Sequence, residues 1–152
     1  MREHYFEDYT VGQIFRGGPS PPLTVEQIKA FAAQYDPQPF HLDEEAAKKT
    51  FFQGLAASGW HTAALTMRMF VDSDVKPVGG YVGAGGEEMR WPRPTRPGDV
   101  LRVEIEILEL RPSRSRPEMG LVKVQITTLN QRDEIAQITK PVMLVPRRPT
   151  AK

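Results

Sequence analysis

The spacing of the apolar residues changes along the chain, and this change restricts the fold more than any other feature. Before Gly79 the apolar residues recur at the three- and four-residue intervals of a helix. After Gly79 they alternate with charged and polar residues, as in Leu101–Ile107 and Val122–Ile126, which is the pattern of antiparallel strands with one buried face. Helices followed by a meander of long strands predict an α+β fold in which an antiparallel sheet covers one helix.

The first part of the chain predicts two short helices with a stiff loop between them. Val25–Ala33 has helical spacing and follows a threonine that can cap its start. Asp43–Lys49 predicts a second helix that is capped by its own aspartate. Pro37 and Pro39 prevent regular helix between the two, so Tyr35–Phe40 is predicted to be a loop.

A longer helix is predicted after Ser58, which is placed to cap it. The apolar residues of this segment share one helical face, which we expect to pack against the sheet. They are Trp60, Ala63, Ala64, Met67, Phe70 and Val71.

Glycines and turn-forming residues divide the second part of the chain. The glycines of residues 79–86 lack the strand-and-helix context of a dinucleotide site, and they predict a curved or bulged strand. Pro94–Asp99 and Asn130–Asp133 have the residues of turns, so we expect strands to end there.

Length and charge exclude several classes of protein. The 152 residues suit a single domain spanning residues 1–152, with a flexible tail after about residue 146. A net charge of +1 gives no broad field that would attract nucleic acid or a membrane surface. No apolar run approaches the roughly 18 residues of a membrane span, and the charged first residues do not resemble a signal peptide. We therefore expect a cytoplasmic protein.

The residue content also limits the chemistry. The chain has no cysteine, which excludes disulfides, thiolate metal sites and a cysteine nucleophile. Its three histidines lack the spacing of metal ligands, so no metal site is predicted. His61, near the start of the long predicted helix, is expected to pack or cap rather than to contact a substrate.

Asp36 and His41 are the first candidate catalytic residues. They lie five positions apart in the predicted loop, where two prolines reduce the entropy lost in fixing their positions. Tyr35 and Phe40 flank the pair and can exclude water. An aspartate and a histidine can activate a water molecule, one taking its proton while the other holds or donates one. An exposed cap or turn is the alternative interpretation of the same residues.

Gly59, at the start of the long helix, is the second candidate. The first N–H groups of a helix have no internal partner and carry partial positive charge. Because glycine has no side chain, a ligand oxygen can approach its amide, which makes an oxyanion site for an enolate or a thioester carbonyl. The alternative interpretation is that Gly59 only permits close packing.

Residues 35–43, Gly59 and residues 89–99 have the order and separation of the motifs of one known family. The first segment reads Tyr-Asp-Pro-Gln-Pro-Phe-His-Leu-Asp, and the last contains Pro-Arg-Pro-Thr-Arg-Pro-Gly-Asp. The first segment resembles the motif Gly-Asp-x-Asn-Pro-x-His-x-Asp of the MaoC-like dehydratases, which include the (R)-specific enoyl-CoA hydratases. Gly59 is similar to the glycine that opens their central helix, and the last segment to their Pro-x-x-Pro-Gly-Asp turn.

The resemblance implies a hot-dog fold, in which a curved antiparallel sheet wraps a long central helix. It also implies reversible addition of water to a trans-2-enoyl-CoA, which gives an (R)-3-hydroxyacyl-CoA. Asp36 and His41 would hold and activate the water, and the Gly59 N–H would bind the thioester oxygen; which of the pair is the base stays open. No cofactor is implied, because coenzyme A is part of the substrate. The implied partners are the acyl-CoA and a second copy of the chain, in a homodimer or a larger homo-oligomer.

Four further residues are predicted to bind the substrate: Ser58, Phe40, Arg90 and Arg93. Ser58 and Phe40 adjoin the candidate catalytic groups. Arg90 and Arg93 suit the phosphates of coenzyme A, although arginines beside turns are commonly only solvated.

Two other functions fit the same resemblance. The hot-dog fold is also used by acyl-CoA thioesterases, which need a polarised carbonyl and an acid that activates water. A non-catalytic acyl-thioester-binding subunit is favoured by two departures from the family motif, Tyr35 in place of glycine and Gln38 in place of asparagine.

Overall fold

The computed structural model describes residues 2–150, which form five strands, four α-helices and one short 3-10 helix. In chain order these are η1 (Phe6–Asp8), β1 (Ile14–Gly17), α1 (Val25–Tyr35), α2 (Pro39–Leu42), α3 (Glu44–Ala47), α4 (Gly59–Asp72), β2 (Gly83–Arg90), β3 (Arg102–Pro112), β4 (Met119–Leu129) and β5 (Ile135–Pro146). The four helices precede the long strands, which confirms the predicted α+β division. Within the described residues, no helix is both long and apolar enough to cross a bilayer.

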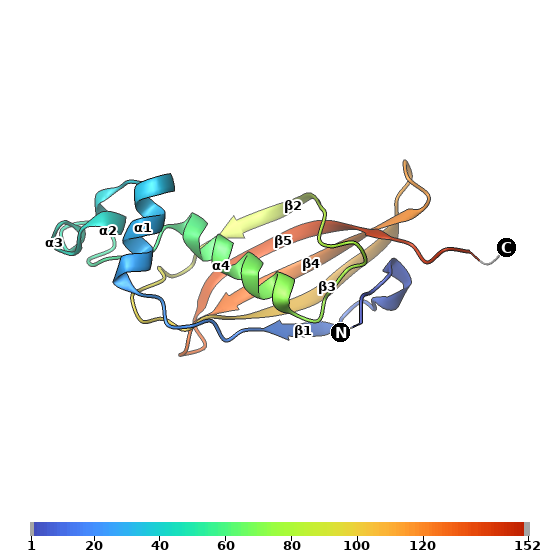
Figure 1. The fold of residues 1–152 in the computed structure, drawn as a ribbon, viewed down its shortest axis with the longest axis horizontal. Helices are drawn as coiled ribbons and strands as arrows, with labels where there is room; N and C mark the ends of the chain where they lie inside the picture. The colour runs from blue at the N-terminus through green and yellow to red at the C-terminus, as the bar shows by residue number, and fades with distance from the viewer. Residues whose placement is uncertain (1, 151–152) are drawn as a thin grey trace.

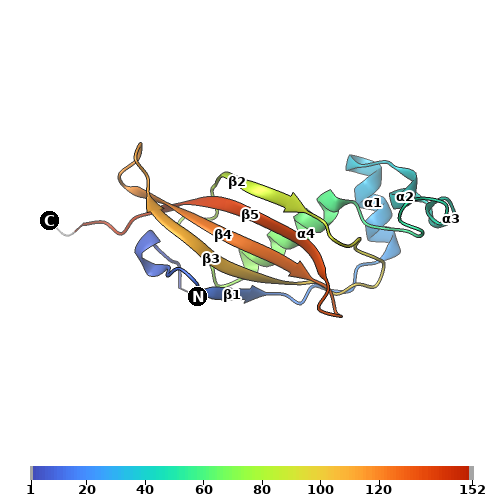
Figure 2. The same ribbon diagram turned by 180° about the vertical axis from the view of Figure 1, so that it is seen from behind.

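The strands form one antiparallel sheet in the order β1-β3-β4-β5-β2. Figure 1 shows α4 running diagonally across one face of this sheet, while α1, α2 and α3 gather beyond one end of it. Figure 2 shows the opposite face, over which no helix of residues 2–150 lies. The main core therefore forms between α4 and the sheet.

Alternate residues of β3 and β4 fill this core. Their inward side chains are at most 1% exposed: Val103, Ile105, Ile107, Val122, Val124 and Ile126. Removing one such side chain from water contributes about 1.5–3 kcal/mol. The strands predicted from the alternation of apolar and polar residues are confirmed.

The face that α4 turns toward the sheet differs from the predicted one. Trp60, Met67 and Val71 were expected to be buried, but they are 59%, 39% and 47% exposed. The buried residues of the helix are His61, Thr62, Thr66, Met69 and Phe70. The prediction of an apolar packing face was therefore wrong except at Phe70, and an apolar stripe of α4 is left on the surface.

Hydroxyl pairs explain why threonines are buried under α4. The Thr62 and Thr95 hydroxyl oxygens lie 2.9 Å apart, and those of Thr66 and Thr128 lie 2.6 Å apart. All four residues are at most 2% exposed. A buried hydroxyl costs little once it has a hydrogen-bond partner, and such partners cannot be identified from helical periodicity.

In the lobe formed by α1, α2 and α3, the structure differs from the prediction at one helix boundary. The segment Tyr35–Phe40 was predicted to be a loop, but Tyr35 ends α1 and Pro39 begins α2, so only residues 36–38 are irregular. The prediction failed at Pro39 because proline suits the first position of a helix, where its missing N–H is not needed. The predicted caps Thr24, Asp43 and Ser58 are confirmed, since each side chain accepts a backbone N–H of its helix.

The glycine-rich strand β2 pairs irregularly with β5, which confirms the predicted bulge. The pairing register shifts between Gly83 and Gly86. A Cβ at position 86 would lie 2.8 Å from the Cα of Pro141, so glycine is needed for the two backbones to approach.

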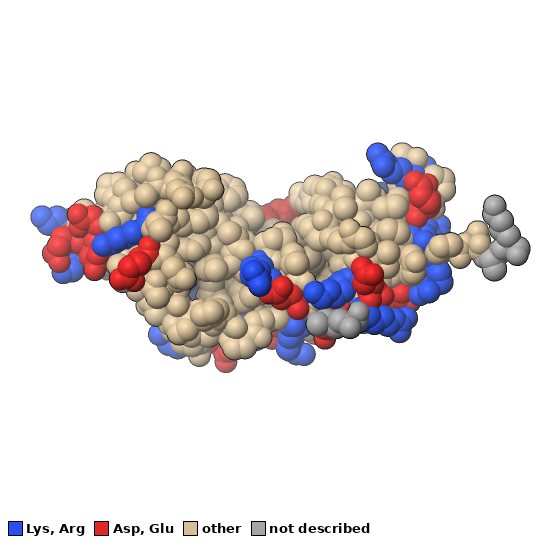
Figure 3. Space-filling model, viewed as in Figure 1, with Lys and Arg blue, Asp and Glu red and all other residues tan. Residues whose placement is uncertain are grey.

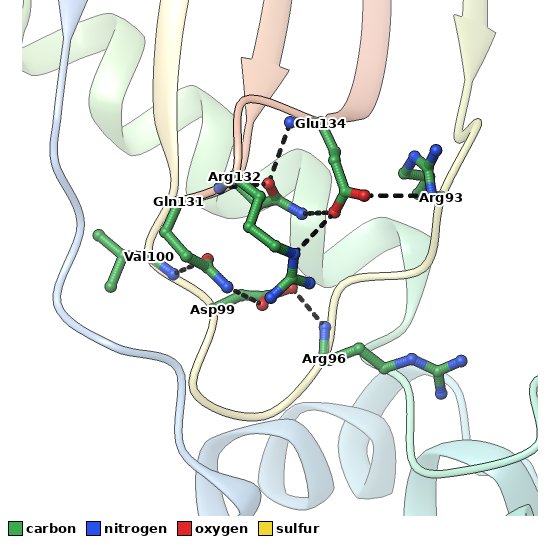
Figure 4. Close-up of polar contacts among 8 residues, drawn as sticks. Arg93, Arg96, Asp99, Val100, Gln131, Arg132 and Glu134 are labelled. Atoms are coloured by element: carbon green, nitrogen blue, oxygen red, sulfur yellow. Dashed lines mark hydrogen bonds and ion pairs between the residues drawn. The ribbon is translucent and has the colours of Figure 1, made fainter.

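A polar network joins the two predicted turns at one end of the sheet (Figure 4). Asp99 accepts hydrogen bonds from the backbone N–H of Arg96 at 2.9 Å and from the side chain of Gln131 at 3.0 Å. Glu134 lies 3.4 Å from Arg93. The connection between β2 and β3 is thereby held against the turn between β4 and β5.

The predicted flexible tail begins with two anchored residues. Arg147 lies 3.0 Å from Glu7, and Arg148 lies 2.6 Å from Asp8. These ion pairs hold the end of β5 beside the short helix η1. Residues 151–152 of the predicted tail lie outside the described residues.

Candidate active site

The end of α1 and the start of α2 bring Asp36 and His41 together. Asp36 is the C-terminal cap of α1, and His41 lies in α2, which starts at Pro39. The Asp36 Oδ2 and His41 Nε2 atoms are 3.3 Å apart, and their side chains are 17% and 5% exposed. The predicted pair therefore meets in space, in a position that is largely shielded from solvent.

A backbone carbonyl orients the His41 ring. The His41 Nδ1 atom is 2.6 Å from the Ala56 oxygen, which can only accept a hydrogen bond, so Nδ1 carries the proton. In the neutral imidazole the free lone pair is then on Nε2, the atom that faces Asp36. Phe40 packs edge-on against the His41 ring at 4.6 Å and against Phe52 at 4.9 Å.

Hydrogen bonds keep the Asp36 carboxyl ionised. Burial acts to raise the pKa of Asp36, but hydrogen bonds from the Gln38 amide and the Ser58 hydroxyl hold that pKa below its ordinary value. The Gln38 side chain donates to Asp36 Oδ1, which leaves Oδ2 directed at His41. The longer Gln38 thus braces the carboxylate at the position where the family motif has asparagine.

The structure shows that Gly59 permits close packing, whereas the oxyanion role of its N–H stays a prediction. It is the first residue of α4, and among the described residues its N–H donates to no protein acceptor. A Cβ at this position would lie 2.7 Å from the Trp91 ring, so glycine is also required for packing. The Ser58 side chain caps the helix by accepting the Trp60 N–H at 3.2 Å.

One cavity of about 410 Å³ contains Asp36, His41 and Gly59. Its lining residues are Asp36, His41, Phe51, Phe52, Ala57, Gly59, Trp60, Thr62, Trp91, Pro92, Arg93, Pro94 and Thr95. Most of this wall is apolar or aromatic, with a few convergent polar groups, which is the usual composition of a small-molecule site. A larger cavity of about 550 Å³ between α4 and the segment after β1 contains none of the three candidate residues.

The structure separates the predicted arginines. Arg93 lines the cavity and lies beside Glu134 (Figure 4). Arg90 does not line it; it is on β2, 61% exposed, and paired with Glu88. Arg96, in the same connection as Arg93, donates to the backbone oxygens of residues 52, 54 and 55 and so ties down the segment before α4.

The remaining predicted residues lie behind the cavity wall. Ser58 is fully buried and contacts the site through Asp36, and Phe40 packs behind His41. His61 does not line the cavity; its ring stacks on Phe31 at 4.6 Å, as expected for a packing role. Its Nδ1 atom has no hydrogen-bond partner among residues 2–150, and burial lowers the pKa of His61.

Several wall residues were not predicted from the sequence. Trp91 lies over Gly59 from the connection after β2, and Phe52 packs beside His41 from the segment before α4. Thr62 and Thr95 bring their paired hydroxyls to the wall. The sequence signal for these wall residues was weak, since it consisted of one aromatic residue, Trp91, directly before the proline-rich turn.

These features define a hot-dog fold whose acid–histidine pair faces the first turn of its central helix. The family model described as "MaoC like domain" matches residues 8–130. The chain belongs to the MaoC-like domain family, which confirms the resemblance noted from its motifs. This membership supports a hydratase or dehydratase in general.

Three relatives illustrate the similarity. A MaoC-like dehydratase from Rhodospirillum rubrum superposes with a TM-score of 0.91 at 50% identity, covering 97% of this chain and 99% of that one. The R-hydratase PhaJ1 from Pseudomonas aeruginosa superposes with a TM-score of 0.74 at 26% identity, covering 97% and 92%. A 3-hydroxybutyryl-CoA dehydratase from Methylorubrum extorquens is 27% identical over 99% of this chain and 90% of its own length.

Proposed function

We propose that the protein adds water reversibly to a trans-2-enoyl-CoA to give an (R)-3-hydroxyacyl-CoA. One observation carries the proposal: Asp36, His41 and the free N–H of Gly59 face a single, mostly apolar cavity. The R-hydratase and 3-hydroxybutyryl-CoA dehydratase among the relatives support this reaction class.

In the proposed reaction, a water molecule is held between Asp36 Oδ2 and His41 Nε2. Both atoms can accept its protons, because the carboxyl is ionised and the imidazole has its lone pair on Nε2. As the water oxygen bonds to Cβ of the enoyl group, the pair takes one proton from it. The pair then returns a proton to Cα, so the substrate gains one complete water molecule and the site is regenerated.

Gly59 has a separate role in this proposal. Attack at Cβ moves negative charge onto the thioester oxygen. The Gly59 N–H, at the positive end of α4, donates to that oxygen. A single well-placed donor of this kind contributes about 10²–10³-fold to a rate.

The decisive experiment follows the loss of enoyl-thioester absorbance with crotonyl-CoA. We expect Asp36→Asn and His41→Ala each to lower kcat by about 10²–10⁴-fold, because each removes a group that handles the proton. Glu45→Gln is the matched control, since Glu45 is an exposed carboxylate of the same lobe. Circular dichroism verifies that each variant is folded, and wild-type rates in both catalytic variants would refute the mechanism.

The same preparations distinguish the two alternatives. A thioesterase would release free coenzyme A from a saturated acyl-CoA, and a binding-only subunit would show affinity without turnover. The contact between Gln38 and Asp36 removes one of the two reasons for the binding-only interpretation.

We also propose that a second copy of the chain covers the exposed stripe of α4 and pairs with the edge strand β2. The stripe comprises Trp60, Met67 and Val71, and every residue of β2 is exposed. Figure 3 shows that the upper part of this side of the molecule carries few charges, whereas basic and acidic side chains gather along its lower middle. A surface of this kind is typical of an interface between subunits.

Light scattering of the purified protein tests the homodimer. We expect the mass of a dimer for the wild-type chain and of a monomer for Met67→Lys, because the new charge would be buried without a partner. Ser115→Lys, at an exposed neutral position between β3 and β4, adds the same single charge and is the control. A monomeric wild-type protein would contradict this proposal.

A further inference from the structure

Three neighbours hold the Trp91 indole in one orientation. Its ring lies over Gly59, where a Cβ would come within 2.7–2.9 Å of three ring atoms. Its Nε1–H donates to the side-chain oxygen of Gln137 at 2.8 Å, and Gln137 is only 1% exposed. The Trp60 ring meets it edge-on at 5.7 Å.

The indole cannot rotate away without losing these contacts. Rotation would leave the buried Gln137 oxygen without its donor, which is unfavourable in a shielded position. Other aromatic residues of the same wall are less constrained: Phe51 is 93% exposed and Trp60 is 59% exposed. Trp91 is therefore a rigid part of the wall, which excludes atoms rather than adapting to them.

The position of Trp91 places this rigid wall beside the reacting atoms. A thioester oxygen bound to the Gly59 N–H would lie on the residue that the indole covers. The double bond would extend from there toward Asp36 and His41, which line the same cavity. The first carbons of the acyl group would thus pass next to the indole.

We infer that Trp91 is a specificity-determining residue that excludes branches on the first carbons of the acyl group. This inference rests on the proposed function, since it takes the acyl thioester as the occupant of the cavity. Each methyl or methylene group that a rigid apolar pocket refuses changes kcat/KM by about tenfold or more. A shorter side chain at position 91 opens the wall and admits a methyl branch.

The test compares crotonyl-CoA with trans-2-methylcrotonyl-CoA in three proteins: the wild type, Trp91→Leu and Phe51→Leu. The measured quantity is the ratio of kcat/KM for methylcrotonyl-CoA to that for crotonyl-CoA. We expect this ratio to rise by at least about tenfold in Trp91→Leu. Phe51→Leu shortens an exposed aromatic residue of the same wall that does not stack on Trp91, and it should change the ratio far less. An unchanged ratio in Trp91→Leu, with both rates lowered together, would overturn the inference.

A binding measurement separates this inference from the proposed reaction. Calorimetry gives the Kd of butyryl-CoA and 2-methylbutyryl-CoA for the same three proteins, with thermal unfolding used to verify that each is folded. If no protein hydrates any enoyl-CoA but Trp91→Leu still shifts the Kd ratio toward 2-methylbutyryl-CoA, the role of Trp91 is supported and hydration is wrong. If hydration occurs and neither ratio shifts, hydration stands and the role of Trp91 is wrong. If neither acyl-CoA binds, both are wrong.

Discussion

The contact between Gly59 and Trp91 makes Gly59→Ala a substitution whose cost can be worked out from the structure. The added Cβ would lie 2.7 Å from the nearest ring atom, whereas ordinary contact begins at 3.4 Å. The ring or the start of α4 must therefore move by at least 0.7 Å, the difference between these two distances. The ring is held by Gln137 and the start of α4 by the Ser58 cap, so neither can move freely.

Two effects are expected from this displacement. Overpacking of this kind lowers the free energy of unfolding by about 1–3 kcal/mol. A shift of the Gly59 N–H relative to Asp36 and His41 lowers kcat, since a misplacement of about 1 Å costs about 100-fold in rate. Urea unfolding measures the first effect, and crotonyl-CoA hydration measures the second.

A double variant tests whether the ring is the cause. Trp91→Leu removes the atoms with which the new Cβ collides, so Gly59→Ala should cost less in its presence. The free energies of unfolding of the two single variants and the double variant form a cycle, and we expect a coupling of about 1–3 kcal/mol. Strictly additive effects, or a Gly59→Ala variant as stable and active as the wild type, would refute the reasoning.

Three further predictions concern other contacts of the site. Gln38→Leu removes a donor that holds the pKa of Asp36 low, so the pKa of Asp36 should rise. The acidic limb of the pH–rate profile should then move to higher pH. Gln38→Asn keeps the amide and should shift this limb less. Burial lowers the pKa of His61 from 6.5, so the unfolded chain binds the proton more readily and the free energy of unfolding should fall as the pH drops below about 6.5. Urea unfolding at pH 7.5 and 5.5 should show this dependence in the wild type and a smaller one in His61→Phe. Arg96→Met leaves the backbone oxygens of residues 52, 54 and 55 without a charged donor and should lower the free energy of unfolding by about 2–3 kcal/mol. Arg96→Lys keeps a charged donor and should lose less stability. An unchanged free energy of unfolding in Arg96→Met would show that these hydrogen bonds contribute little.

The long strands were predictable because their pattern is local. In β3 and β4, every second residue is apolar over a span long enough to exclude a helix. β1 was missed because Ile14–Gly17 has only four residues and is stabilised by pairing with β3, nearly ninety positions further along the chain. Short edge strands of this kind depend on partners that local periodicity does not reveal.

The meeting of Asp36 and His41 was predictable for a similar reason, and the surroundings of this pair were not. Asp36 and His41 are close in sequence, so two prolines and a short helix suffice to bring them together. Trp91 reaches Gly59 from a segment thirty-two positions away, and nothing in the intervening pattern indicates the contact. The buried face of α4 was mispredicted because Thr62 and Thr66 obtain their hydroxyl partners from other elements.

The two hydroxyl pairs under α4 also fix the position of the helix along its own axis. Apolar side chains tolerate sliding, because one methyl group can replace another at little cost. Thr62 and Thr66 are four residues apart on one side of the helix, a rise of about 6 Å, and each has its own partner, Thr95 or Thr128. A slide by one turn that carried Thr66 to Thr95 would carry Phe70 to Thr128 and leave that hydroxyl buried and unpaired. The two pairs therefore fix the position of the helix against β4 and against the connection between β2 and β3, and this position sets the depth at which its first N–H enters the cavity.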